Sequence, residues 1–330
     1  MFQRASPIRA TYSRRTGELP LNGKEITRIP LQIGEVVTNF AKMALTGIPV
    51  AVNFDITYNC NLRCEHCYYW ASIAALGIKK WELSDEQWIT VFKYYQKLGV
   101  RNVSLTGGEP TLRMNLIKEA HEYFSQVQTA TNGMIKIPRS VQPRGIWLSI
   151  DGPEEIHNKI RGSKTCFQKL VANYQDDKRV AVSSTISTTN YKYIDAIVKV
   201  VQDLNVNGVF FMLYSGTKDN PLLPTGKIYA KVMADLARVT REYPDTVLIT
   251  SDMLQAYHNK QHVKNCPFLN HRRPASIFSF YADMTKKRCV LGDNVNCATC
   301  SCIVPVGTYV LQHNTANLEN YRKIMKILGQ

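Results

Sequence analysis

The sequence predicts an α/β fold built on a parallel sheet. Short apolar runs alternate with amphipathic segments after residue 49, and the residues that could bind a cofactor or take part in catalysis directly follow these runs. Strands interleaved with helices form parallel sheets with right-handed crossovers, and their carboxyl ends share one edge. Strands are expected at 50–57, 102–106, 127–131, 146–151, 180–187 and 208–214, and helices at 84–98, 115–125, 164–174 and 191–204.

Residues 1–48 precede this alternation. The first thirty residues are rich in Arg, Thr, Gly and Pro, and we expect an extended lead-in outside the sheet. From Gln32 to Leu45 apolar residues recur at helical spacing, and Gly47 and Pro49 end the segment. We expect this helix to cap the lower end of the sheet, while peripheral contact with a membrane surface stays open. Charged residues, Gly and Pro interrupt 33–54, so no membrane span is predicted.

The composition predicts a globular chain of one large domain and a smaller one. The 330 residues include 41 basic and 26 acidic ones, which gives a net charge of +15. The basic residues are dispersed rather than gathered in a run, so nucleic acid is not an expected partner. Nine cysteines behind a start without a signal peptide are typical of a reducing compartment, and we expect a cytoplasmic protein.

The first strand leads into three closely spaced cysteines, in the segment Cys60-Asn-Leu-Arg-Cys64-Glu-His-Cys67. A [4Fe-4S] cluster normally takes a thiolate on each iron, so three cysteines leave one iron open to a small molecule with an amine and a carboxylate. The alternative is a zinc site, which needs four ligands and would use His66 in place of a fourth cysteine. A disulfide is disfavoured in a reducing compartment.

The second strand ends in a glycine pair followed by a carboxylate, Gly107-Gly108-Glu109-Pro110. Glycine allows the backbone to approach a ligand closely because no Cβ intervenes. A carboxylate at a strand end can accept hydrogen bonds from an ammonium group. Alone these residues indicate only a turn, but in this position, after a three-cysteine loop, they strengthen the prediction of a cofactor site.

Together the two motifs resemble those of the radical S-adenosylmethionine (SAM) superfamily. The resemblance implies a partial (β/α)6 TIM-like barrel with a [4Fe-4S] cluster on Cys60, Cys64 and Cys67. It implies that SAM is reductively cleaved to a 5′-deoxyadenosyl radical, with an electron donor such as ferredoxin or flavodoxin. The substrate, a small molecule, peptide or lipid, is not identified by any short motif.

The resemblance also implies which side chains contact SAM. Arg161 is assigned to the SAM carboxylate, because a guanidinium matches a carboxylate bidentately, and Asp151 and Ser149 to hydroxyl or other polar groups of SAM. Val209 is placed near adenine, while His157 is interpreted as structural. The full predicted set is His66, Gly107, Gly108, Glu109, Thr131, Asn132, Ser149, Asp151, Arg161, Thr185 and Val209.

Beyond residue 250 the alternation fades and the chain becomes rich in cysteine. We expect a small auxiliary-cluster extension over 251–330, after a barrel over 49–250. It resembles the SPASM and twitch extensions, although its spacing matches neither fully, and more weakly the tail of the adenosyl-hopene transferases. A zinc site stays open because thiolates suit zinc equally well. The predicted ligands of a second iron-sulfur cluster are Cys266, Cys289, Cys297, Cys300 and Cys302; Cys166 is interpreted as a buried apolar residue.

These observations predict a radical SAM enzyme with an unassigned substrate. A peptide- or protein-modifying maturase and a lipid- or isoprenoid-modifying enzyme are the alternatives within this chemistry. A zinc-stabilised nucleic-acid-binding protein is the alternative from a different class.

Overall fold

The computed structural model describes residues 48–70, 81–216, 219–269, 276–314 and 316–329. The lead-in and the helix expected over 32–45 lie outside these residues.

The predicted parallel α/β architecture is confirmed, and the sheet is larger than expected. All pairs among the first six strands are parallel, and the sheet order is β6-β5-β4-β3-β2-β1-β7-β8. Because β6 and β8 are its edges, the sheet stays open, as in a partial barrel. The six predicted strands are β1 (Ala51–Thr57), β2 (Asn102–Gly107), β3 (Gln126–Thr131), β4 (Ile146–Ser149), β5 (Val180–Ile186) and β6 (Val209–Leu213).

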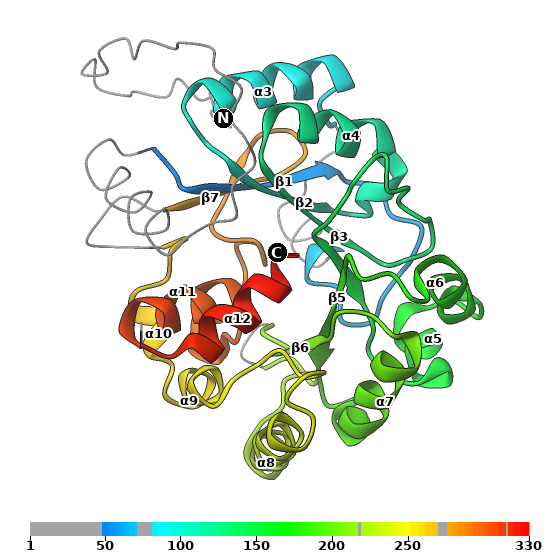
Figure 1. The fold of residues 1–330 in the computed structure, drawn as a ribbon, viewed down its shortest axis with the longest axis vertical. Helices are drawn as coiled ribbons and strands as arrows, with labels where there is room; N and C mark the ends of the chain where they lie inside the picture. Colours follow the sequence, from blue (N-terminus) through cyan, green and yellow to red (C-terminus); the bar gives the residue numbers. More distant parts are fainter. Residues whose placement is uncertain (1–47, 71–80, 217–218, 270–275, 315, 330) are drawn as a thin grey trace, which may run out of the picture.

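Helices cover the outside of this curved sheet (Figure 1). The four predicted helices form, and a further helix, α5, which was not among the expected ones, follows the fourth strand. The helices that alternate with the six strands are α3 (Asp85–Lys97), α4 (Met114–Tyr123), α5 (Glu154–Arg161), α6 (Cys166–Tyr174), α7 (Ile194–Leu204) and α8 (Gly226–Glu242).

Helix α3 illustrates how local sequence and core packing agree. Ser84 caps its amino end through a reciprocal capping box with Gln87, which satisfies two backbone N–H groups that lack helical partners. Trp88 and Phe92, four residues apart on one face, are fully buried. Both rings pack against Phe54 of β1, at centroid distances of 5.4 and 5.8 Å. The capped helix thereby holds the strand that leads into the three-cysteine segment.

The carboxyl-terminal part corrects the six-strand expectation, because it contributes to the sheet. Strand β7 (Ile277–Phe280) pairs parallel with β1, and β8 (Lys286–Lys287) pairs antiparallel with β7. Strands this short, four residues in β7 and two in β8, leave little pattern in the sequence. The remaining helices are α9 (Ser251–Asn259), α10 (Gln261–Lys264), α11 (Ile303–His313) and α12 (Leu318–Ile327).

Helices α11 and α12 lie at the open side of the sheet, between β6 and β7 (Figure 1). Two side chains of the barrel hold the end of α12. The indole N–H of Trp147 on β4 donates to the Ile327 carbonyl at 2.6 Å, and Asn207 Nδ2 donates to the Lys326 carbonyl at 3.2 Å. These bonds satisfy carbonyl groups that a helix end leaves without helical partners. The opening of the partial barrel is therefore covered by the chain's own carboxyl-terminal helices.

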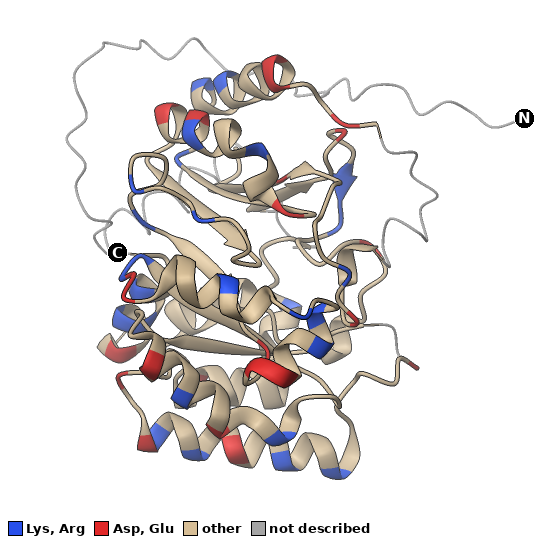
Figure 2. Cartoon of the chain, turned by 90° about the vertical axis from the view of Figure 1, so that its right-hand side faces the viewer, with Lys and Arg blue, Asp and Glu red and all other residues tan. Residues whose placement is uncertain are grey.

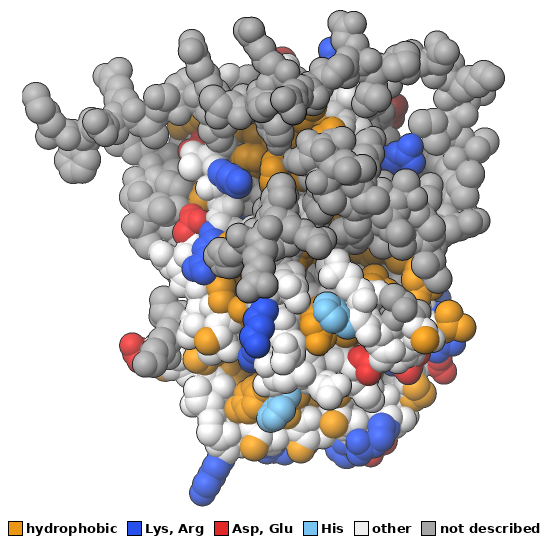
Figure 3. Space-filling model, turned by 90° about the vertical axis from the view of Figure 1, so that its left-hand side faces the viewer, with side chains coloured by type: hydrophobic (Ala, Val, Ile, Leu, Met, Phe, Trp, Pro, Cys, Tyr) orange, Lys and Arg blue, Asp and Glu red, His pale blue; other side chains and the backbone are white. Residues whose placement is uncertain are grey.

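The net positive charge is distributed over the surface. Lys and Arg alternate with Asp and Glu along the helices seen in Figure 2. On the face shown in Figure 3, apolar side chains lie among polar and basic ones. No helix in the described part of the chain is long and apolar enough to cross a membrane.

Candidate active site

A cavity of about 420 Å³ runs through the interior of the barrel. Its upper end, the mouth, is lined by the three-cysteine segment and by the carboxyl ends of β2, β3, β4 and β5. Its lower part lies between the inward faces of the strands and helices α11 and α12. Most of the predicted cofactor residues line this one space: Cys60, Cys64, His66, Cys67, Gly107, Gly108, Glu109, Thr131, Asn132, Ser149, Arg161 and Thr185.

Cys60, Cys64 and Cys67 are free, half-buried thiols at the mouth of the cavity. Burial raises the pKa of Cys60 to about 11 and also raises the pKa of Cys67. The thiolate is the form that binds metal, so a bound cation would have to offset this burial. Three thiols open to a cavity suit a cluster that leaves one iron for a small-molecule ligand.

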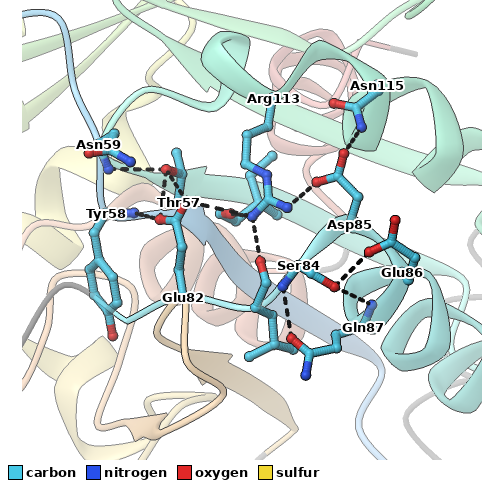
Figure 4. A network of polar contacts seen from close by, with 12 residues as sticks. Thr57, Tyr58, Asn59, Glu82, Ser84, Asp85, Glu86, Gln87, Arg113 and Asn115 are labelled. Atoms are coloured by element: carbon cyan, nitrogen blue, oxygen red, sulfur yellow. Dashed lines mark hydrogen bonds and ion pairs between the residues drawn. The ribbon is translucent and has the colours of Figure 1, made fainter.

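A polar network fixes the backbone just before these cysteines (Figure 4). Glu82 accepts hydrogen bonds from Thr57 Oγ1 at 2.9 Å and from the Tyr58 N–H at 2.7 Å. Arg113 donates to the carbonyls of Ile56 and Leu83, at 3.0 and 2.8 Å, and pairs with the carboxylate that begins α3. Because Arg113 ends the turn after the glycine pair, the network ties the cysteine segment to the second motif.

The glycine pair is required by the close approach of two backbones. Gly107 has φ +117°, which side-chain-bearing residues rarely adopt. A Cβ on Gly108 would lie 2.0 Å from the Asn59 carbonyl oxygen, which no structure tolerates. The two N–H groups after the bend, those of Gly108 and Glu109, donate to the carbonyls of Thr57 and Asn59. The pair therefore lets the end of β2 pass directly against the cysteine segment.

Glu109 is a buried carboxylate that accepts four hydrogen bonds. Its Oε1 accepts from the Thr111 N–H, from Thr111 Oγ1 and from Thr131 Oγ1, and its Oε2 accepts from the Asn132 N–H at 2.8 Å. No ion pair joins it to a basic side chain in the described residues. Burial raises the pKa of Glu109. An unpaired buried carboxylate at the cavity wall fits an ammonium group of a ligand.

Asp151 and Arg161 form a buried ion pair beside the cysteines. Arg161 Nε and Nη2 contact Asp151 Oδ2 at 2.7 and 2.6 Å, and its Nη1 faces Cys64 Sγ at 3.8 Å. Burial raises the pKa of Asp151. The neighbouring Arg161, His66 and His157 together outweigh that effect, so the pKa of Asp151 lies below its usual value. His66 Nε2 lies 3.7 Å from Asp151 Oδ2, and burial lowers its pKa. Asp151 therefore orients Arg161, and only Nη1 faces the cysteines.

The other predicted residues are not equally close to the cavity. Thr131 and Asn132 lie at its wall, where both contact Glu109. Val209, which begins β6, does not line it, because its side chain lies on the opposite face of the strand from the face that lines the cavity. Met212, three residues later on the same strand, does line the cavity.

The five carboxyl-terminal cysteines lie near one another around an apolar cluster. Cys266 and Cys289 are buried with Phe268. Burial raises the pKa of Cys266 to about 12 and that of Cys289 to about 11, and the Cys300 thiol adds to both shifts. Cys302 is also buried and is the member that lines the cavity. This donor set suits an iron-sulfur cluster or zinc.

Neither cysteine group is already arranged as a metal site. In the described ranges, no three His, Cys, Asp or Glu side chains are grouped closely enough to hold an ion. The thiols of each group would therefore have to turn towards a bound metal.

Sequence analysis missed the residues that support the site. Glu82 and Arg113 lie outside both motifs, and their contacts join segments separated by more than twenty positions. The available signal in the sequence was Arg113, two positions after Thr111, together with Glu82 shortly before α3. It becomes interpretable only once the strands are placed side by side.

The comparison with protein families decides the assignment. The model of the radical SAM superfamily matches residues 54–219, half of the chain, and includes both motifs. The chain belongs to the radical SAM superfamily. The matched range begins within the first strand and ends just beyond the sixth, so it covers the six-stranded parallel part of the sheet and its helices up to α7.

Two relatives show the breadth of this superfamily. The sporulation killing factor maturation protein SkfB of Bacillus subtilis is 28% identical over 175 residues, which cover 49% of this chain and 41% of SkfB. The Fe-coproporphyrin III synthase of Methanosarcina barkeri is 29% identical over 183 residues, 51% of this chain and 45% of that protein. The alignments therefore span about half the length of these relatives.

Two solved structures share the fold. The anSMEcpe structure with bound AdoMet has a TM-score of 0.53 at 17% identity and covers 74% of each chain. Streptococcus suis SuiB bound to the precursor peptide SuiA has a TM-score of 0.55 at 15% identity and covers 78% of this chain and 64% of SuiB.

Proposed function

We propose that this radical SAM protein binds a [4Fe-4S] cluster at Cys60, Cys64 and Cys67 and modifies a substrate held in the barrel. The observation that carries the proposal is the single cavity shared by three free thiols, the glycine pair and the unpaired carboxylate of Glu109. When bound, the cluster and SAM supply a 5′-deoxyadenosyl radical through one-electron reductive cleavage, with an external donor such as ferredoxin or flavodoxin. Superfamily membership favours an enzyme over a nucleic-acid-binding protein.

The chain's own residues would bind and orient SAM at the cavity mouth. Glu109 would accept hydrogen bonds from the SAM ammonium, which supplies the positive charge that this buried carboxylate lacks. Arg161 Nη1 would face the SAM carboxylate, while Asp151 holds the other side of the guanidinium. Ser149 and Thr185 would offer hydroxyl groups from neighbouring strands.

We further propose that the extension over 251–330 binds a second metal centre. Cys266, Cys289, Cys297, Cys300 and Cys302 offer five thiols, more than the four that a closed cluster or a zinc ion needs. The resemblance of this cysteine-rich segment to the SPASM and twitch extensions makes an iron-sulfur cluster the first choice.

A peptide is the substrate class that we favour. SkfB is named as a maturation protein, and SuiB is seen with a precursor peptide. Porphyrins of the kind named for the other relative carry carboxylates, which would need basic partners inside the cavity. The one Arg that lines it in the described ranges is already paired with Asp151.

The test is release of 5′-deoxyadenosine by the anaerobically reconstituted protein under dithionite. Wild type should release it, and Cys64→Ala should not. Cys166→Ala is the matched control, because Cys166 is a buried cysteine on α6 that does not line the cavity. Wild type that binds iron yet releases no deoxyadenosine would contradict the proposal.

A further inference from the structure

The lower half of the cavity has a different chemical character from its mouth. The charged side chains lining the cavity in the described ranges are Glu109 and Arg161, both at the mouth. Although the chain carries a net charge of +15, no described lysine lines the cavity. Burying an unpaired charge in such a space is strongly unfavourable. A group that enters the lower cavity must therefore be uncharged.

Every second residue of each strand faces the cavity. In the lower cavity these inward-facing residues form a wall that is polar but neutral. Gln128 of β3 and Ser183 of β5 line it. They precede the predicted SAM contacts Thr131 and Thr185 by three and two residues, so they lie about 7 to 10 Å deeper along the strands. The opposite wall is mainly apolar and comes from α11, α12 and the residue that follows α12, with Ile303, Val304, Thr308, Leu311, Ile324, Met325 and Leu328.

Gln128 carries an amide that the described protein does not use. Its residue is 8% exposed, yet its side chain has no hydrogen-bond partner in the described ranges. The inward-facing neighbours on β1 and β2 differ in this respect: Ser104 donates to Asn53 at 2.8 Å, and Thr106 donates to Asp55 at 2.7 Å. The amide opens onto the cavity, so a ligand held there can pair with it directly.

We propose that the lower cavity is the substrate pocket and that Gln128 is its specificity-determining residue. The pocket takes an uncharged, mainly apolar group that carries one amide function, such as an aliphatic side chain with its adjoining backbone amide. The Gln128 amide can donate to the carbonyl and accept from the N–H of that function. Because SAM and this group share about 420 Å³, the group is of side-chain size. This inference rests on the proposed function, since it places the group below the radical site.

The test is binding of small probes to the reconstituted protein with SAM and without reductant. N-acetyl-leucinamide is the neutral probe, and N-acetyl-leucine is its charged counterpart. Saturation-transfer NMR titrations should show the amide binding and the acid binding at least tenfold more weakly. Gln128→Ala should weaken binding of the amide about fivefold, the usual effect of losing a hydrogen-bond partner. Gln128→Met, which keeps the volume and removes the hydrogen bonds, serves if the alanine variant does not fold.

Gln96→Ala is the matched control, because Gln96 is exposed on α3, away from the cavity, and this variant should bind the amide like wild type. Binding of the acid as tight as that of the amide, no binding of either probe, or equal binding by the Gln128 and Gln96 variants would each overturn the inference. Deoxyadenosine release, measured separately on the same wild-type preparation, reports on the proposed function, so failure of one can be told from failure of the other.

Discussion

The two cysteine groups of this chain use the same side chain in different surroundings. Cys60, Cys64 and Cys67 are half-buried and line the cavity, whereas Cys266 and Cys289 are buried in an apolar cluster. The first group has three thiols and a neighbouring space for a small molecule. The second has five cysteines, and of these Cys302 alone lines the cavity, although Cys297 and Cys300 are half-buried like the first group. A group open to the cavity, suited to chemistry, can therefore be told from a closed group, suited to a second metal, by its place at the cavity and its number of thiols.

The largest effect is expected when the open group is removed. Replacing Cys60, Cys64 and Cys67 with alanine should abolish deoxyadenosine release and lower iron by about four atoms per chain, since each cluster holds four. Iron, sulfide and product assays on anaerobic preparations measure both effects. Retained deoxyadenosine release would place the reactive cluster elsewhere.

Removing the closed group should separate metal content from SAM cleavage. In Cys266→Ala/Cys289→Ala/Cys300→Ala we expect about four iron atoms to remain, with deoxyadenosine still formed. If zinc occupies the group in wild type, zinc is lost instead. Metal analysis decides between the two. Full retention of all metal would show that these cysteines are not ligands.

A buried ion pair links the strands that lead into the two groups. Lys287 of β8 contacts Asp55 of β1 at 2.6 Å, and both side chains are fully buried. Lys287→Ala would leave the Asp55 carboxylate without its cation, so we expect a loss of about 3 to 5 kcal/mol in unfolding free energy. Urea denaturation measures it, with Lys286→Ala as the exposed neighbouring control. Equal stabilities would show that the pair does not hold the strands together.

Glu109→Gln should weaken SAM binding about 10- to 100-fold, the range of a lost charge-assisted hydrogen bond. Because burial raises the pKa of Glu109, affinity in wild type should also fall on acidification at a higher pH than for an ordinary carboxyl group. Only the ionised form, which predominates above that pKa, attracts the ammonium. Equilibrium dialysis measures both effects.

Glu122→Gln, which changes an exposed glutamate on α4, is the control. Unchanged SAM affinity in Glu109→Gln would remove the carboxylate from the binding site.

The smallest effect concerns the support behind the open group. Ser84→Ala removes the cap of α3 and should cost about 1 kcal/mol of stability without changing the metal content. Thermal unfolding and iron analysis measure the two separately. Loss of iron in this variant would show that the cysteine segment depends on the capped helix more directly than we infer.

Sequence predicted what depends on local pattern. The six strands alternate with helices, and the two motifs contain enough residues at fixed spacing to assign the superfamily. The sequence alone could not predict that Asp151 orients Arg161. That pairing depends on which charged side chains are buried together in the fold. The resemblance placed Val209 near adenine, whereas the face of β6 that lines the cavity, that of Met212, is known only from the fold.

The covering of the open side also lay beyond local pattern. Strands β7 and β8 and helices α11 and α12 reach it through contacts between segments far apart in sequence, such as the bond from Trp147 to Ile327. No periodicity in either segment records that contact.

Electron paramagnetic resonance of the dithionite-reduced protein, with and without SAM, tests the contrast between the two groups most directly. The variant that lacks Cys266, Cys289 and Cys300 should show a cluster signal that shifts when SAM is added. The variant that lacks Cys60, Cys64 and Cys67 should show no signal that responds to SAM. A response to SAM in the second variant, or none in the first, would contradict the assignment of the open and closed groups.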